Sequence, residues 1–158
     1  ICQDKEIDMA NTTFSGPVIS NNGFQSTPIA LTDASVTLTR LDNGGRVNVI
    51  PAIGGNRTIT LPTPVAGTKF TFIYGGAAEE TENVIFDTGS DTNFFIGGVQ
   101  HLDTNADNVS VYSDGNSNSI LTLIDFGIIE INILAKDDTN WYVWGNVISA
   151  TAPTFADQ

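Results

Sequence analysis

The amino-acid sequence predicts an all-β protein: a single antiparallel β-sandwich or jelly roll with an extended N-terminal arm. From about residue 28 onward, short segments alternate apolar or β-branched residues with polar ones, which is typical of half-buried strands. Glycine, asparagine and aspartate separate these segments at spacings of roughly 8–12 residues, as in β-sandwiches. No segment combines a helical period with helix caps. The length of 158 residues fits one domain.

Five predicted strands fill the first half of the domain, at residues 36–41, 46–50, 57–61, 68–74 and 83–86. In the segment 68–74, Phe70, Phe72 and Tyr74 occupy alternate positions and therefore share one face of the strand. The alternation in 46–50 likewise places Val47 and Val49 on one face. We expect these apolar faces to be buried.

Five further strands are predicted at residues 94–96, 108–112, 120–124, 128–134 and 141–144. Isoleucine and leucine dominate 120–124 and 128–134, and aromatic residues dominate 141–144. With these strands in place, we expect no more than one short helix. The residues expected to form the core are Leu38, Val47, Val49, Ile59, Leu61, Phe70, Phe72, Phe86, Val111, Leu121, Leu123, Ile131, Ile133 and Val143.

Turns are predicted where residues that tolerate a positive φ angle gather between the strands. Pro62 and Pro64 add a stop after the strand at 57–61. The predicted turn segments are Asn43-Gly44-Gly45, Gly54-Gly55-Asn56, Gly75-Gly76, Gly97-Gly98 and Asp114-Gly115-Asn116.

The chain divides into an N-terminal arm at residues 1–27, a β-sandwich domain at 28–152 and a C-terminal tail at 153–158. The arm lacks alternation, so we expect a neighbouring subunit or surface to order it. Its expected anchors are Phe14, Val18, Ile19 and Phe24. Lys5-Glu6 can be encoded as a ribosome-binding sequence ahead of Met9, so we hypothesise that residues 1–8 are translated leader sequence.

Composition limits the classes of partner. The formal net charge is −12, and no basic residue lies between Lys69 and Lys136, a stretch that holds ten acidic residues. Such a surface repels nucleic acid and anionic lipid, so we expect neither as a partner. No apolar run approaches the roughly 20 residues that cross a membrane, and no signal peptide is evident. Cys2 is the single cysteine, which excludes an internal disulfide.

One motif resembles an enzyme signature. Asp87-Thr88-Gly89-Ser90 follows a predicted strand and is similar to the catalytic loop of aspartic proteases, in which two carboxylates share a proton. The chain contains no second Asp-Thr-Gly or Asp-Ser-Gly. A homodimer could supply the second aspartate, as in retroviral proteases. The alternative interpretation is a strand followed by a tight turn, and we favour it.

Two further groups of residues were weighed as sites. Asp103, Asn105, Asp107 and Asp114 match positions 1, 3, 5 and 12 of a calcium-binding loop, but the glycine and the exiting helix of that motif are absent. An acidic surface loop is the alternative. His101 is the single histidine, and we interpret it as a surface or turn residue. We therefore expect no catalytic, cofactor-binding or metal-binding residues, and no enzyme activity.

A resemblance to a viral family comes from two regions. Residues 9–18 together with Asn22-Gly23-Phe24 look like the start of small head proteins of tailed bacteriophages, marine ones especially. The second region has the order strand, Leu61-Pro62, Ala66-Gly67, aromatic strand and Asn140-Trp141. This order is similar to β-sandwich modules on phage capsids and fibres.

The resemblance implies a capsid decoration protein, which binds the outside of the head after the shell expands. It implies that the major capsid protein is the partner, that the oligomer is a homotrimer, and that the protein is made in the host cytoplasm and resides on the capsid exterior. The alternative is a tail-fibre or receptor-binding knob, in which exposed aromatic residues such as Tyr112 or Trp144 stack on sugars. The remote alternative is a homodimeric aspartic protease acting through Asp87-Thr88-Gly89.

Overall fold

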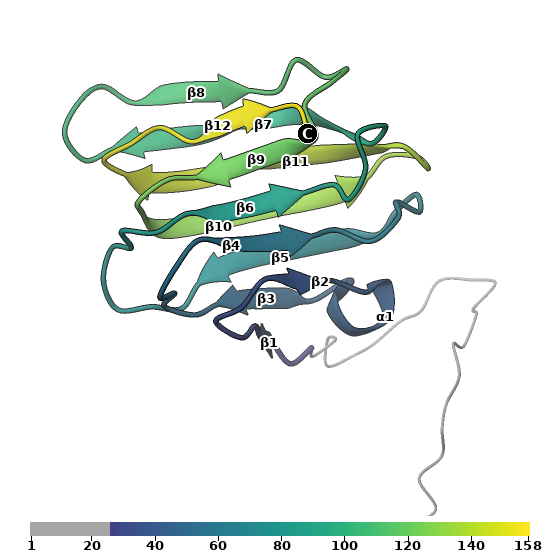
Figure 1. Cartoon of the computed structure of the whole chain (residues 1–158), viewed down its shortest axis with the longest axis horizontal. Helices are drawn as coiled ribbons and strands as arrows, with labels where there is room; N and C mark the ends of the chain where they lie inside the picture. Colours follow the sequence, from purple (N-terminus) through teal and green to yellow (C-terminus); the bar gives the residue numbers. More distant parts are fainter. Residues whose placement is uncertain (1–25) are drawn as a thin grey trace, which may run out of the picture.

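The computed structural model describes residues 26–158. The expected arm anchors and the hypothesised leader lie outside the described residues. The described part is an all-β sandwich, as predicted, in which two sheets pack face to face (Figure 1). Strands contribute 47% of it and helix only 3%, so a helical class is excluded.

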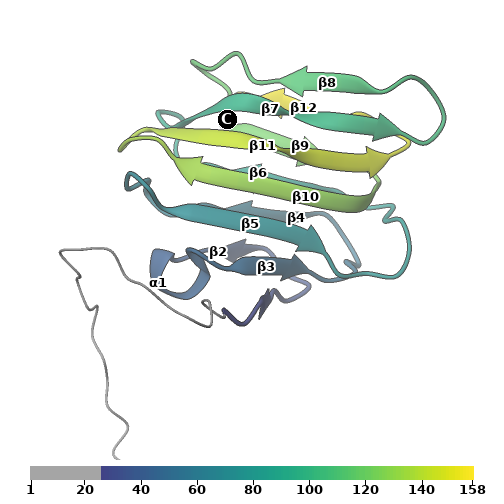
Figure 2. The ribbon, with the colours of Figure 1, turned by 180° about the vertical axis from the view of Figure 1, so that it is seen from behind.

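The larger sheet has seven strands. Their order across the sheet is β1 (Ile29–Ala30), β3 (Val47–Ile50), β5 (Lys69–Tyr74), β10 (Phe126–Ala135), β11 (Asn140–Ser149), β7 (Phe94–Asp103) and β8 (Val109–Tyr112). The smaller sheet has five strands, in the order β12 (Thr154–Ala156), β9 (Ile120–Leu123), β6 (Val84–Asp87), β4 (Arg57–Thr60) and β2 (Val36–Thr37). The view from behind shows the larger sheet in front (Figure 2).

The sheets are mixed, whereas the sequence analysis expected antiparallel ones. From β1 to β6 the chain alternates between the sheets, and β1, β3 and β5 run parallel to one another, as do β2, β4 and β6. The first half of the domain therefore winds in three successive turns. We call each turn a coil: it consists of one strand of the larger sheet followed by one strand of the smaller sheet. The second half adds the antiparallel pairs β7–β8 and β10–β11, while β11 also pairs in parallel with β7. Alternating sequence patterns report which face is buried, but they carry no information on strand direction.

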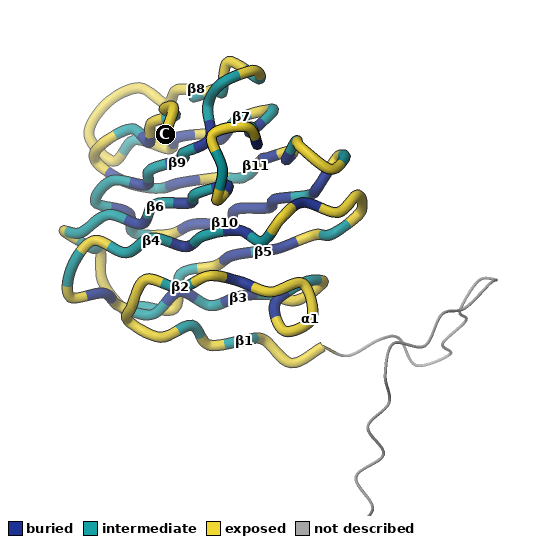
Figure 3. Tube along the Cα trace, turned by 45° about the vertical axis from the view of Figure 1, so that its right-hand side comes forward, coloured by how far each residue is buried: buried dark blue, intermediate teal, exposed yellow. Residues whose placement is uncertain are grey.

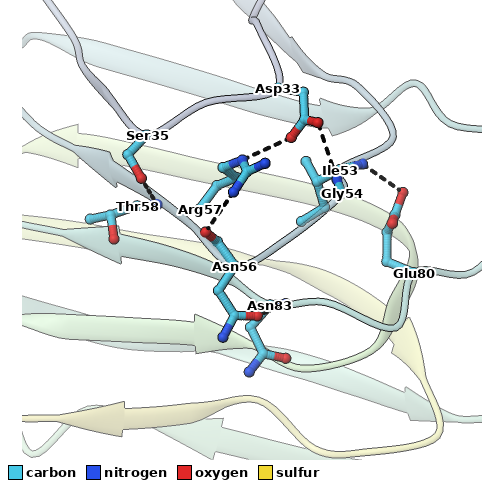
Figure 4. A network of polar contacts seen from close by, with 9 residues as sticks. All are labelled: Asp33, Ser35, Ile53, Gly54, Asn56, Arg57, Thr58, Glu80 and Asn83. Atoms are coloured by element: carbon cyan, nitrogen blue, oxygen red, sulfur yellow. Dashed lines mark hydrogen bonds and ion pairs between the residues drawn. The ribbon is translucent and has the colours of Figure 1, made fainter.

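Polar contacts tie successive coils together at one end of the sandwich (Figure 4). Arg57 at the start of β4 forms an ion pair with Asp33 (2.8 Å), whose carboxylate also accepts a hydrogen bond from the Gly54 N–H. The N–H groups of Thr58 and Asn83 donate to the Ser35 hydroxyl and to the Asn56 side chain, respectively. The loops 31–35, 51–56 and 75–83 therefore support one another.

The core lies between the two sheets, as the tube coloured by burial makes visible (Figure 3). Phe72 of the larger sheet contacts Phe86 of the smaller one at a ring-centroid distance of 4.7 Å, and Phe95 approaches Phe155 at 6.1 Å. Most of the predicted core is buried. The confirmed positions are Leu38, Ile59, Leu61, Phe70, Phe72, Phe86, Leu121, Leu123, Ile131, Ile133 and Val143.

Val111 is only partly buried and packs against the edge of this core. The expectation for Val47 and Val49 was wrong, because in β3 the residues Asn48 and Ile50 face the core instead. Asn48 is fully buried and accepts a hydrogen bond from the side chain of buried Asn43 (2.9 Å). This pairing satisfies the polar groups and allows an amide to occupy an inward position.

The predicted strand at 36–41 is cut short. β2 ends at Thr37, and the helix α1 (Arg40–Asn43) follows. The Thr39 hydroxyl accepts a hydrogen bond from the Asp42 N–H (3.0 Å) and caps this single turn. The Thr39 cap and the Asn43-Gly44-Gly45 turn together favour a helical turn at residues 40–43, despite the β propensity of residues 36–41.

The turn predicted at Gly97-Gly98 is also wrong, because both glycines lie within the ten-residue strand β7. Gly97 has φ = +112°, and a Cβ atom there would lie 2.4 Å from the Val143 carbonyl oxygen of β11. Close approach of two strands therefore explains this glycine. At the C-terminus, the segment expected as a tail contains β12, which pairs with β9.

Candidate interaction surface

The outer face of the larger sheet is the most apolar exposed surface among the described residues. Six of the nine exposed large hydrophobic side chains lie on it, at alternate positions of β5, β10, β11, β7 and β8. These six residues are Ile73, Leu102, Tyr112, Ile128, Tyr142 and Trp144. Half-buried Phe94, Ile96, Leu134 and Ile148 lie between them. We refer to these ten residues as the apolar face.

Several polar side chains on this face are paired with one another. The Thr71 hydroxyl donates to Asn132 Oδ1 (2.9 Å), and the Asn132 amide donates to the Glu130 carboxylate (3.2 Å). The Lys69 ammonium lies 5.5 Å from the centre of the Trp144 ring, within range of a cation–π interaction. Since these groups have partners within the face, covering the face with another surface leaves few polar groups unsatisfied.

Two aromatic side chains on the face flank a glycine. Strand pairing places Gly98 of β7 next to Trp144 of β11 on one side and next to Tyr112 of β8 on the other. Both side chains are exposed, Tyr112 at 69% and Trp144 at 42%, as the sequence analysis anticipated. A Cβ atom at position 98 would meet the Tyr112 ring at 2.8 Å. The Tyr112 ring therefore occupies space that a side chain at position 98 would need, which explains the glycine.

The protease-like motif forms the end of β6 and the turn after it. Asp87 points outward from the smaller sheet, and its carboxylate accepts hydrogen bonds from the Gly89 N–H (2.6 Å) and from the Gln158 side chain. The Thr88 hydroxyl is buried and donates to the carbonyl oxygens of Ser90 and Asn93 (2.9 Å each). The contacts of Asp87 with Gly89 and of Thr88 with Ser90 and Asn93 hold the turn in shape, and the contact with Gln158 ties the turn to the C-terminal segment.

The calcium-like residues are divided between opposite ends of β8. Asp103 ends β7 and Asn105 and Asp107 lie in the β7–β8 loop, whereas Asp114 lies in the loop after β8. Asp103 accepts the N–H groups of Asn105 (2.7 Å) and Ala106 (2.9 Å), which is local turn capping. Within residues 26–158, no three side chains of His, Cys, Asp or Glu gather in an arrangement that could hold a metal ion.

The interpretation of His101 as a surface or turn residue was wrong. His101 is fully buried on the inner face of β7, and its Nε2 lies 3.1 Å from the Ser149 carbonyl oxygen. A carbonyl oxygen only accepts, so Nε2 carries the hydrogen and donates it. Nδ1 has no partner within the described part of the chain. The error follows from the missed length of β7: once the strand continues past Gly98, alternation turns His101 inward.

Charge is distributed unevenly between the two ends of the sandwich. At the end of the sandwich where Arg57 lies, Arg57 is the one basic residue among the described residues. Seven acidic residues lie at the same end, in loops and at strand ends: Asp33, Glu79, Glu80, Glu82, Asp103, Asp107 and Asp125. We call this region the acidic end. The opposite end also holds seven described acidic residues, and the other four described basic residues, Arg40, Arg46, Lys69 and Lys136, lie at or near it; its acidic residues are Asp42, Asp87, Asp91, Asp114, Asp137, Asp138 and Asp157. The apolar face between the ends carries one charge of each sign, at Lys69 and Glu130.

The sequence analysis singled out Tyr112 and Trp144 but missed the rest of the apolar face. A signal was present: residues 141–144 are apolar at every position, and 128–134 places isoleucine or leucine on both faces of the strand. A strand with solvent on one side alternates more strictly than this.

Comparison of the chain with models of protein families, with curated proteins and with solved structures gives no match. In the part of the chain that the structure describes, no helix has the length and apolar character needed to span a bilayer. Function is therefore argued below from the surface and from the sequence resemblance.

Proposed function

We propose that this protein is a non-enzymatic structural protein of a phage virion, which binds and stabilises the outer surface of the capsid as a decoration protein. The observation that carries the proposal is the apolar face on a sandwich of otherwise acidic character. An exposed apolar surface of this extent marks a contact with another macromolecule. It extends over five neighbouring strands, an extent that suits a protein partner better than a small molecule.

The type of partner comes from the sequence resemblance to head proteins of tailed phages. A decoration protein requires a rigid scaffold, and its contacts are repeated many times around a symmetric shell, so weak individual contacts add through avidity. The two-sheet core and the cross-linked coils supply such a scaffold. The proposed partner is the major capsid protein, and the proposed location is the capsid exterior.

The test is a sedimentation assay with purified heads. The full chain is mixed with expanded heads that lack the protein and, separately, with unexpanded heads, and the pellets are analysed. We expect saturable binding to expanded heads at a fixed ratio to the major capsid protein. Absence of binding to expanded heads would contradict the proposal, and an image reconstruction of the virion would then show whether the chain lies elsewhere.

A second candidate function is a tail-fibre or receptor-binding module that binds sugar. The exposed rings of Trp144 and Tyr112, on either side of Gly98, favour it, because aromatic faces stack on the apolar faces of sugar rings. Gln100 and Asn146 lie at neighbouring positions of the same face and offer hydrogen-bonding groups. A glycan array separates the two functions: selective glycan binding that is lost on Trp144→Ala supports the receptor-binding role, and an array without binding supports decoration.

A further inference from the structure

We propose that the apolar face is a self-association surface, on which a second copy of this chain packs face to face about a two-fold axis. This inference does not depend on the virion role: it concerns the free protein in solution, where no capsid shell competes for the apolar face. The occupant is argued below from the charge of the chain, from the size of the face and from the positions of its two charged residues.

Charge restricts where two copies can meet. Each copy carries a net charge of −12, and contact through either end of the sandwich would bring seven acidic residues of each copy together. The charges of the apolar face, one lysine and one glutamate, cancel. Since like charges in contact are unfavourable, two identical acidic molecules meet at lowest electrostatic cost on a surface of this kind.

The size of the face suits a stable dimer. The five strands of the face hold 6, 10, 10, 10 and 4 residues. At about 3.3 Å per residue and about 4.8 Å between strands, they cover roughly 630 Å². A standard stable interface buries roughly 600–1,000 Å² on each partner, so the face lies at the lower end of that range.

The two charged residues are placed symmetrically about one row of the sheet. Thr71 pairs with Asn132 in register, and this row continues through Trp144 to Gly98. Lys69, opposite Leu134, lies one outward-facing row to one side, and Glu130, opposite Ile73, lies one row to the other side. A two-fold axis along the central row brings Lys69 of each copy toward Glu130 of the other. The same symmetry places Trp144 near its own equivalent.

Charge reversal tests this arrangement. The full-length wild type, Lys69→Glu, Glu130→Lys and the double variant are compared by sedimentation equilibrium, with circular dichroism as the check on folding. We expect the wild type to be a dimer. Each single reversal is expected to raise the dimer dissociation constant at least about tenfold, because it faces like charges. The double variant exchanges the two charges, so it is expected to recover most of the wild-type affinity.

A matched pair of apolar substitutions gives a second measurement. Ile128 on the face and Leu41 on α1 are both highly exposed, at 68% and 74%. Ile128→Lys is expected to weaken the dimer at least about tenfold, and Leu41→Lys to leave it unchanged. Both substitutions place a charged side chain in solvent, so folding of the monomer is retained.

Several results would overturn the inference: a wild type that is monomeric at every concentration, a trimer, an equal effect of Ile128→Lys and Leu41→Lys, or a double charge variant as weak as the singles. The proposed function fails separately. A dimer that ignores expanded heads contradicts the decoration role alone. A monomer that binds heads and loses binding with Ile128→Lys contradicts the self-association alone, and assigns the face to the shell.

Discussion

Tyr74 links the end of β5 to the loop that follows. Its ring packs edge-to-face against Phe126 at 5.2 Å, and its hydroxyl contacts the Ala78 carbonyl oxygen (2.8 Å) and the Glu80 carboxylate. Glu80 also accepts a hydrogen bond from the Ile53 N–H, so the two loops are joined through this carboxylate. Burial, together with the neighbouring Glu80, raises the pKa of Tyr74 to about 12.

This raised pKa predicts a loss of stability in alkali. The folded state favours the neutral hydroxyl, so the stabilisation is complete below the unfolded-state pKa of about 10 and is lost as the pH rises toward 12. Tyr74→Phe removes the ionisable group and should flatten that part of the profile. The urea midpoints of the wild type and of Tyr74→Phe at pH 8 and pH 11 measure this loss of stability. An equal decrease of the midpoint in both proteins would argue against the role of Tyr74.

Asp87 yields a second prediction at this scale. Asp87→Asn keeps a side-chain oxygen that can accept the Gly89 N–H, so we expect the turn to persist and the free energy of unfolding to change by less than about 1 kcal/mol. Peptidase assays on the wild type and on the variant complete the test. A peptidase activity inhibited by pepstatin and abolished by the substitution would show that the protease interpretation is correct.

At the scale of single elements, close contacts between strands determine where glycine is required. Gly145 of β11 has φ = +155°, and a Cβ atom there would lie 1.9 Å from the Glu130 carbonyl oxygen of β10. Gly115 also has a positive φ (+77°), but no atom lies within 4 Å of its Cβ position. Comparing substitutions at the two glycines therefore separates the free-energy cost of a strained φ angle from the cost of a steric clash between Cβ and the neighbouring strand.

Substitution of both glycines by alanine measures that difference. Gly145→Ala is expected to cost about 2–4 kcal/mol of stability, because it adds a backbone clash to the strained φ. Gly115→Ala is expected to cost about 1 kcal/mol, from strain alone. Chemical denaturation of the two variants gives the comparison, and equal costs would show that the contact between β10 and β11 relaxes easily.

The sequence predicted most elements because alternation reports burial directly. β5 and β10 have dense apolar alternation, and each was found within two residues of its bounds. β7 was found only at its start, because Gly97-Gly98 has the composition of a turn and the contact with Val143 that requires glycine is between strands distant in sequence. The Asn43–Asn48 pair was not predicted, because apolar alternation alone indicates Val47 and Val49 as the inward positions of β3. The apolar face was seen only as isolated aromatic residues.

At the scale of the whole molecule, the core of the described residues, including the partly buried members, lies between Leu31 and Phe155. The arm hypothesis predicts that deleting residues 1–25 leaves a cooperative thermal transition, with a melting temperature within about 4 °C of that of the full chain. The arm hypothesis adds that head binding should weaken. Calorimetry and the sedimentation assay measure the two effects, and loss of the cooperative transition would assign the arm to the core.

The series of coils from β1 to β6 has a consequence for how such a protein can change in length. Each coil contributes one strand to each sheet, and these strands pair only with the strands beside them, so the coils act as repeated structural units. Consider a segment of about 20 residues inserted before β3. Such a segment would extend each sheet by one strand, or about 4.8 Å. It needs apolar residues at its inward positions and a polar residue that continues the hydrogen bonds between the loops. The antiparallel half and its exposed face would keep their geometry. Related proteins could therefore differ in the width of both sheets by whole coils while the apolar face stays the same.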